Sequence, residues 1–209
     1  GNESFDALSE EMENWPTYYP ADMSGTEIAE DMLEHEEKEY DEHVWLSLKN
    51  AQTLCKAIAE ALETADPDHK DTYAANIDAY LEKLSSLDGQ YQDAVANASQ
   101  KTLLFGDRFP FRYMVDDYGL KYYAAFAGCS AESEASFETI SFLGLKNIMT
   151  IENSDQKIAK TIRDNTKDKN QEILSLDSMQ STTSEDVKNG TTYLSVMESN
   201  LDVLKKAMQ

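Results

Sequence analysis

One histidine stands where a helix is expected to begin, and its setting suits a metal ligand. His43 ends a long acidic run, and the apolar residues Val44, Trp45 and Leu46 follow it directly. Ser47 is an expected N-cap, because its hydroxyl can accept a hydrogen bond from a free backbone N–H of the next helix. Neutral imidazole binds zinc, manganese, iron or nickel, and a helix start fixes its direction. Taken alone, the pattern also describes a surface histidine beside a buried tryptophan, which is the commoner case.

Three carboxylates follow short apolar segments that have the character of strands. Asp107, Glu152 and Asp177 each come within two residues of the end of such a segment, and we call them the strand-end carboxylates. In an open parallel sheet, ligands bind beyond the carboxyl ends of the strands, so we expect the three along one edge. Together with His43 they form a candidate nitrogen and oxygen site for a divalent transition metal.

Each strand-end carboxylate also has a structural alternative. Asp107 could pair with Arg108 or Arg112, and Glu152 or Asp177 could cap the helix that follows it. The residues alone leave both interpretations open.

The apolar periodicity predicts an α/β fold. Helical spacing runs over residues 48–63 and 68–97, and Pro67 separates the two helices. From residue 101, short apolar strands alternate with amphipathic helices, which indicates a parallel sheet with helices on both faces. The expected strands are 102–105, 122–126, 148–151 and 173–176, and the expected helices are 110–117 (with Gly119 after its end), 137–143, 154–167 (with a Ser N-cap) and 192–208.

The charge of the chain limits its partners. The net charge of -22 argues against nucleic acids and anionic membrane surfaces, which both require patches of lysine and arginine. No apolar run is long enough to span a bilayer. Residues 1–42 hold many carboxylates and a single lysine. They read either as a solvated acidic linker or as a loop in which His35 and its neighbours gather cations.

Enzyme motifs are missing from the sequence. It contains no G-x-S-x-G, H-E-x-x-H, P-loop or G-x-G-x-x-G pattern, and no histidine follows position 69. The α/β half therefore lacks the usual general base. Cys129 is the one tempting nucleophile, whereas Cys55 fits a small buried hydrophobe in a helix.

Several segments together resemble one known family, the zinc/manganese solute-binding proteins of bacterial ABC transporters. Asp41-Glu-His-Val-Trp-Leu is similar to that family's Asp-Pro-His-Val-Trp-Leu, with Glu42 in place of the proline. The resemblance covers about residues 41–209. Its other segments are the long helix from Tyr73 to Asp88, Phe111-x-Tyr113 with Asp117-Tyr-Gly-Leu120, Gly190-x-x-Tyr193 and Asn200-Leu201.

The resemblance implies a metal site, with one departure. It makes His43 the nitrogen ligand and Asp177, after the last strand, an oxygen ligand. Where the family usually has a third ligand this chain has Arg108, which cannot bind a metal because guanidinium stays protonated without a free lone pair. Either Asp107 or Glu152 supplies the missing ligand, or Arg108 neutralises a carboxylate that is not needed as a ligand. The expected metal ligands are His43, Asp177, Glu152 and Asp107, with Arg108 and Trp45 beside them.

The resemblance also implies a division of the chain. The family's first ligand is a histidine in an N-terminal lobe, and His35 is only a weak candidate for it. Because most of that lobe has no counterpart here, we expect an incomplete or trimmed chain. Residues 1–46 are then a remnant of the N-terminal lobe with an acidic loop. Residues 47–100 form a helical spine with the long linker helix, and residues 101–209 form the C-terminal α/β lobe.

The function implied by the resemblance is metal capture for import. We expect a monomeric, extracytoplasmic protein, either periplasmic or anchored as a lipoprotein, that binds Zn²⁺ (alternatively Mn²⁺) and delivers it to an ABC permease with its ATPase. Two rivals remain open. Arg108 and the missing histidine would suit an adhesin or regulatory module without tight metal binding, and Cys129 would suit an α/β enzyme acting on a small substrate.

Overall fold

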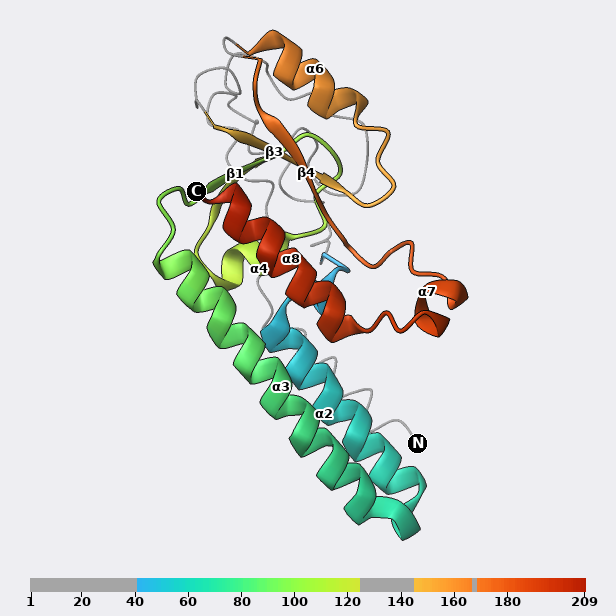
Figure 1. The fold of residues 1–209 in the computed structure, drawn as a ribbon. Helices are drawn as coiled ribbons and strands as arrows, with labels where there is room; N and C mark the ends of the chain where they lie inside the picture. Colours follow the sequence, from blue (N-terminus) through green and yellow to red (C-terminus); the bar gives the residue numbers. More distant parts are fainter. Residues whose placement is uncertain (1–40, 125–144, 167–168) are drawn as a thin grey trace, which may run out of the picture.

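A computed structural model describes residues 41–124, 145–166 and 169–209 (Figure 1). The predicted α/β fold, with a four-stranded parallel sheet flanked by helices and a long backbone helix, is confirmed. In chain order the elements are η2 (Val44–Leu46), α2 (Leu48–Ala65), η3 (Pro67–His69), α3 (Lys70–Ala96), β1 (Thr102–Phe105), α4 (Arg112–Asp117), β2 (Lys121–Ala124), β3 (Asn147–Ile151), α6 (Lys157–Asn165), β4 (Glu172–Leu176), α7 (Ser184–Lys188) and α8 (Tyr193–Ala207).

The order of the strands creates a reversal in the middle of the sheet. The order is β2-β1-β3-β4, and all neighbours are parallel. β1 pairs with β2 along its whole length, whereas β1 and β3 meet at Phe105 and Met149. The chain leaves β1 toward one side and returns on the other, so a topological switch point lies at the carboxyl ends of β1 and β3. Asp107 and Glu152 follow these two strands.

Helices cover both faces of the sheet, and the strands alternate accordingly. Leu103 and Phe105 of β1 belong to the larger core, with α3 and α8, whereas Leu104 belongs to a smaller core under α6. This is the two-residue alternation of a strand buried on both sides. The larger core joins residues of the predicted spine (47–100) to residues of the predicted C-terminal lobe (101–209), so residue 100 does not divide it. The three-part division itself stays a prediction.

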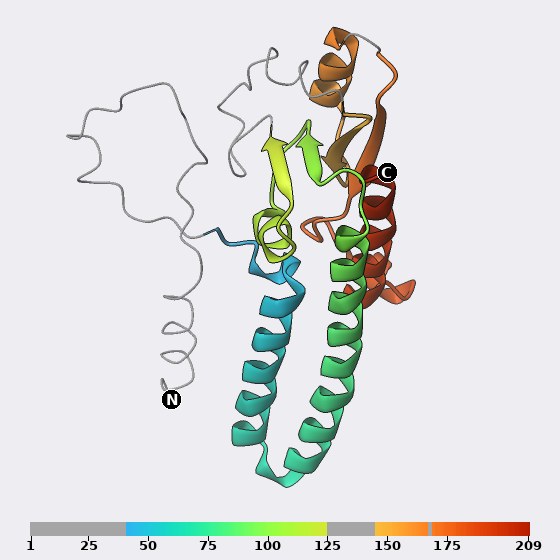
Figure 2. The same ribbon diagram turned by 90° about the vertical axis from the view of Figure 1, so that its left-hand side faces the viewer.

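The helices α2 and α3 form a long hairpin that extends away from the sheet (Figures 1 and 2). α2 begins as predicted, because the hydroxyl of Ser47 accepts a hydrogen bond of 2.9 Å from the N–H of Asn50. The 27 residues of α3 span about 40 Å at 1.5 Å per residue. None of the helices that the structure describes is long and apolar enough to cross a membrane.

Helix α4 ends in a glycine-dependent turn, as the sequence predicted. Gly119 has a φ of +64°, in the left-handed region that glycine adopts without strain. Its N–H donates to the carbonyl of Asp116, and the N–H of Leu120 donates to the carbonyl of Val115. These two bonds make a Schellman motif, which turns the chain into β2.

The prediction of a serine N-cap on the helix after β3 was wrong. The hydroxyl of Ser154 accepts from the N–H of Gln156, two residues on, and Asp155 accepts from Lys157. α6 starts only at Lys157, after Gln156 in the left-handed conformation with a φ of 58°. The helix predicted at 137–143, the strand end at 125–126, and Cys129 and His35 lie outside the described residues.

Gly106 brings α6 directly against the end of β1. A Cβ at this position would lie 2.8 Å from the Cα of Ala159 and 2.8 Å from Cγ2 of Ile148. The N–H of Gly106 donates to the carbonyl of Met149, which holds the chain beside β3. Close packing at Gly106 thus fixes where the next residue, Asp107, leaves the sheet.

Candidate metal centre

The predicted nitrogen ligand, His43, is buried and held by its own chain. It is 4% exposed and precedes the short helix η2. Oδ1 of Asp41 accepts a hydrogen bond of 2.9 Å from the backbone N–H of His43 and lies 2.8 Å from its ring Nδ1. The surface alternative for His43 is therefore wrong.

Asp41 is held in turn by two residues of α4. Its Oδ2 lies 3.4 Å from Nε of Arg112, and both side chains are 9% exposed. The hydroxyl of Tyr113 donates to the backbone carbonyl of Asp41 over 2.8 Å. Burial raises the pKa of Asp41, but the hydrogen bonds from His43 and the charge of Arg112 outweigh it and hold that pKa below its ordinary value. Asp41 is therefore ionised at neutral pH.

Trp45 connects the histidine to the loop after β4. Its ring centroid lies 5.4 Å from that of His43. Its indole Nε1 donates to the backbone carbonyl of Ser178 over 3.0 Å, and its own carbonyl accepts from the hydroxyl of Tyr193 over 2.7 Å. The turn that carries His43 is therefore fastened to the loop that carries Asp177.

Glu152 is engaged by that same loop. One oxygen accepts from the backbone N–H of Ser178 and the other from its hydroxyl, both over 2.7 Å. Ser178 is fully buried. Glu152 therefore links the ends of β3 and β4, and it does not cap the following helix.

Asp177 is set by a buried asparagine of α8. The side chain of Asn200 accepts from the N–H of Asp177 and donates to its carbonyl, both over 2.8 Å. The carboxylate accepts from the N–H of Met179, which forms a turn and no helix cap. Burial raises the pKa of Asp177 above its ordinary value; the Met179 bond opposes this shift and the charge of Glu152 adds to it.

Asp107 keeps one oxygen without a partner. Its Oδ1 accepts from the backbone N–H of Arg108 over 2.8 Å. Its Oδ2 is buried, and within the described part of the chain it has no hydrogen-bond partner. Neither arginine side chain considered as a partner for Asp107 takes that role in the described residues. Arg112 pairs with Asp41, and the side chain of Arg108 is exposed.

One tight group of acidic and histidine side chains is local in sequence. One oxygen each of Asp41 and the exposed Glu42 and a ring nitrogen of His43 lie within 4.8 Å of one another, a spacing that exposed acidic groups also show without a metal. Across residues 41–124, 145–166 and 169–209, no comparably tight group of three includes any strand-end carboxylate. The predicted ligand set stays a prediction: His43, Asp177, Glu152 and Asp107.

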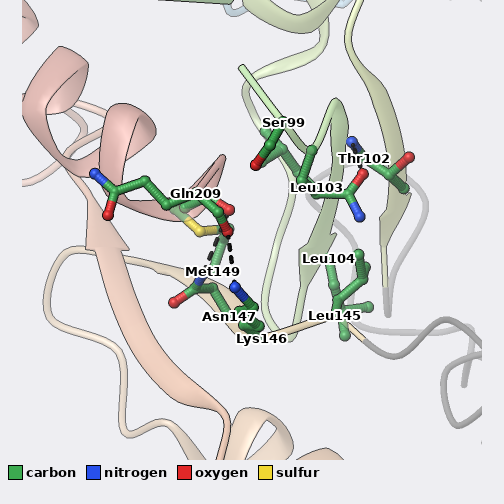
Figure 3. A pocket seen from close by; sticks show the side chains of 11 residues that line it. Ser99, Thr102, Leu103, Leu104, Leu145, Lys146, Asn147, Met149 and Gln209 are labelled. Atoms are coloured by element: carbon green, nitrogen blue, oxygen red, sulfur yellow. Dashed lines mark hydrogen bonds between the residues drawn. The ribbon is translucent and has the colours of Figure 1, made fainter.

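A pocket of about 230 Å³ lies at the opposite edge of the sheet (Figure 3). Leu103 and Leu104 of β1 and Asn147 of β3 line it near the amino ends of their strands, with Gln209 after α8. It is lined by none of the candidate ligands, so it is separate from the candidate metal centre.

A comparison with protein families decides the relationship of the chain. The family described as Zinc-uptake complex component A periplasmic (ZnuA) matches residues 3–207. The chain belongs to this ZnuA family.

Among curated relatives, the Zinc-binding lipoprotein AdcA of Streptococcus pneumoniae (strain ATCC BAA-255 / R6) is 37% identical over 175 residues, which cover 80% of this ZnuA-family chain and 34% of AdcA. The High-affinity zinc uptake system protein ZnuA of Bacillus subtilis (strain 168) is 30% identical over 175 residues, 80% of this chain and 53% of that protein. The chain therefore spans about a third of AdcA and about half of the B. subtilis protein.

Solved structures show the same fold. The Zn(II)-bound ZnuA-like domain of S. pneumoniae AdcA matches with a TM-score of 0.66 and 36% identity, over 81% of this chain and 64% of that one. The laminin-binding protein Lmb of Streptococcus agalactiae, described as bifunctional with adhesin and metal transporting activity, matches with a TM-score of 0.69 and 26% identity, over 81% and 65%.

Sequence reasoning on this ZnuA-family chain missed the residues that hold the candidate ligands in place. Asp41 stood in the quoted motif without a role, although a carboxylate two residues before a histidine is a local signal for this bond. Arg112, Ser178 and Asn200 gave no such signal, because their partners lie 23 or more residues away in the chain.

Proposed function

We propose that the protein captures a divalent metal ion, zinc with manganese as the alternative, as cargo for an ABC importer. His43 supplies the nitrogen ligand, Asp177 and Asp107 supply oxygen ligands, and Glu152 is a further oxygen ligand or the link between two loops. Arg108 and Trp45 lie beside the ligands. The partners are the ABC permease and its ATPase, and the protein works as an extracytoplasmic monomer, periplasmic or anchored as a lipoprotein.

One structural observation favours a cation at this edge of the sheet. The Oδ2 atom of Asp107 is buried without a hydrogen-bond donor among the described residues, at the switch point where open sheets bind ligands. A buried carboxylate oxygen is costly unless a donor or a cation meets it. Membership of the zinc-uptake family supports zinc as that cation.

The fit of the donor set supports zinc first. Zinc takes imidazole nitrogen and carboxylate oxygen in four-coordinate sites, and manganese accepts more oxygen-rich sites. No enzyme motif is needed for this role, and we propose binding and delivery in place of catalysis.

The test is metal titration of the metal-stripped protein, with His43→Ala and His69→Ala side by side. His69 is a matched control, because its ring also bonds an aspartate, Asp66, yet its side chain is 67% exposed. We expect one tight zinc equivalent by calorimetry. At a free zinc concentration of 1,000 Kd it would stabilise the fold by about 4 kcal/mol, since only the folded state binds.

His43→Ala should lose that equivalent and His69→Ala should keep it. Weak binding of several equivalents, unchanged by His43→Ala, would mean that the acidic surface merely collects cations. That result would overturn the proposal.

A second function has one observation in its favour. The match to Lmb, described as an adhesin as well as a metal transporter, suggests adhesion to a host protein such as laminin. Immobilised laminin tests it: saturable binding by both the wild type and His43→Ala would establish adhesion independent of metal, and no binding would exclude it.

A further inference from the structure

We infer that Asp41 is a positioning residue for metal capture, which fixes the tautomer and direction of His43 so that Nε2 faces the metal. Nothing in the family resemblance assigns this carboxylate a role. The inference rests on the proposed function and deepens it.

One oxygen of Asp41 is shared by two nitrogens of His43. Oδ1 of Asp41 receives both the backbone N–H and the ring Nδ1 of His43, over 2.9 Å and 2.8 Å. An ionised carboxylate only accepts hydrogen bonds, so the ring proton must lie on Nδ1. The lone pair of the neutral imidazole then lies on Nε2, which leaves Nε2 as the atom through which His43 would bind the proposed metal.

Asp41 is itself held by two residues of α4. Its other oxygen faces Nε of Arg112 at 3.4 Å, and its backbone carbonyl accepts from Tyr113. Both residues belong to the first turn of α4, and their side chains are buried. The direction of the carboxylate is therefore set by contacts within the protein, without a metal.

Asp41 differs from its acidic neighbour Glu42 in burial and in contacts. Glu42 carries the same charge beside the same histidine, and its side chain is exposed. If charge near His43 were all that mattered, the two acids would be equivalent. Burial and the bond to Nδ1 distinguish Asp41, and a carboxylate placed in this way both orients a ligating histidine and raises its basicity.

The experiment compares Asp41→Ala, Asp41→Asn and Glu42→Gln with the wild type. Zinc affinity is measured by competition with a chromophoric chelator, and melting temperatures of the metal-free forms report folding. Asp41→Ala should weaken zinc binding about 10- to 100-fold, the usual effect of removing such a partner. Asp41→Asn should lose less zinc affinity, because its amide oxygen can still accept a hydrogen bond from Nδ1. This variant also has nearly the shape of aspartate, so it serves as the test if Asp41→Ala does not fold. Glu42→Gln should keep wild-type affinity.

A second readout needs no metal. The ring ¹⁵N shifts of His43 in the metal-free protein should report a proton on Nδ1 in the wild type and in Asp41→Asn, and a mixture of tautomers in Asp41→Ala. Three results would overturn the inference: wild-type zinc affinity in Asp41→Ala, an equal loss of affinity in Glu42→Gln, or a proton on Nε2 in the wild type. If the wild type still binds zinc tightly, the proposed function stands. Absence of tight zinc binding in the wild type would overturn both.

Discussion

The loops after β1 and β4 each carry an aspartate whose carboxylate accepts from a nearby backbone N–H, but they differ in what else holds them. After β4, the backbone of Asp177 is paired with Asn200 and its carboxylate accepts from Met179. After β1, Asp107 accepts from Arg108 with one oxygen, and the other is buried without a partner in the described ranges. The same sequence signal, an acid after an apolar strand, predicted both. The backbone of the β4 loop is therefore held by α8, whereas the β1 loop keeps a buried carboxylate oxygen that needs a cation or a hydrogen-bond donor.

The largest expected effect is a loss of stability when the contact between α8 and the β4 loop is removed. Asn200 is 2% exposed, and Asn200→Ala would remove the partner of the part-buried N–H and carbonyl of Asp177. Each such group costs about 1–3 kcal/mol, so the free energy of unfolding should fall by about 3 kcal/mol. Urea denaturation of the metal-free protein measures it. Ser199→Ala, at the exposed neighbouring position, is the control, and an equal loss there would show that α8 is merely sensitive to alanine.

A smaller effect is expected from the link between β3 and β4. Glu152→Ala removes both hydrogen-bond acceptors for Ser178. Hydrogen bonds to a charged group contribute more than neutral ones, but the partial exposure of Glu152 reduces their contribution. The free energy of unfolding of the metal-free protein should therefore fall by about 2 kcal/mol. Thermal melts against Glu198→Ala, an exposed acid of α8, provide the comparison. A gain in stability would instead mean that the repulsion between the charges of Glu152 and Asp177 dominates, as expected if both are ligands of the proposed metal.

The smallest effect should have the opposite sign. Asp107→Asn keeps an oxygen for the N–H of Arg108 and removes the charge from the unpartnered position. The metal-free protein should become more stable by up to about 1 kcal/mol, while zinc binding weakens. Asp116→Asn, an exposed acid on α4, is the control for net charge. A loss of stability would show that Oδ2 of Asp107 has a partner in solution, and the contrast between the two loops would disappear.

The sequence predicted what neighbouring residues decide. Ser47 caps α2 and Gly119 ends α4 because both signals act within a few residues. The strands followed from apolar runs, and their shared edge followed from the parallel order. Ser154 misled the prediction because two capping residues stand in succession, and a left-handed residue after them delays the helix.

The rest of the candidate site depends on tertiary structure. Ser178 meets Glu152 and Trp45 only because β3, β4 and η2 end at one place. Arg112 meets Asp41 across 71 positions of the chain, as 112 − 41 = 71, so nothing local in the sequence indicates the pair. Which acids are exposed, paired or unpartnered is therefore a property of the folded sheet edge.

The tight contact at Gly106 limits how this edge can be redesigned. A side chain at Gly106 would collide with the backbone of Ala159, which cannot rotate aside as a side chain could. A protein engineer who wished to vary the proposed metal site could exchange Asp107 for histidine or cysteine, but could not add a side chain one residue earlier without displacing α6. Because α6 packs against Gly106, position 107 is the first in the β1 loop at which side-chain chemistry can vary.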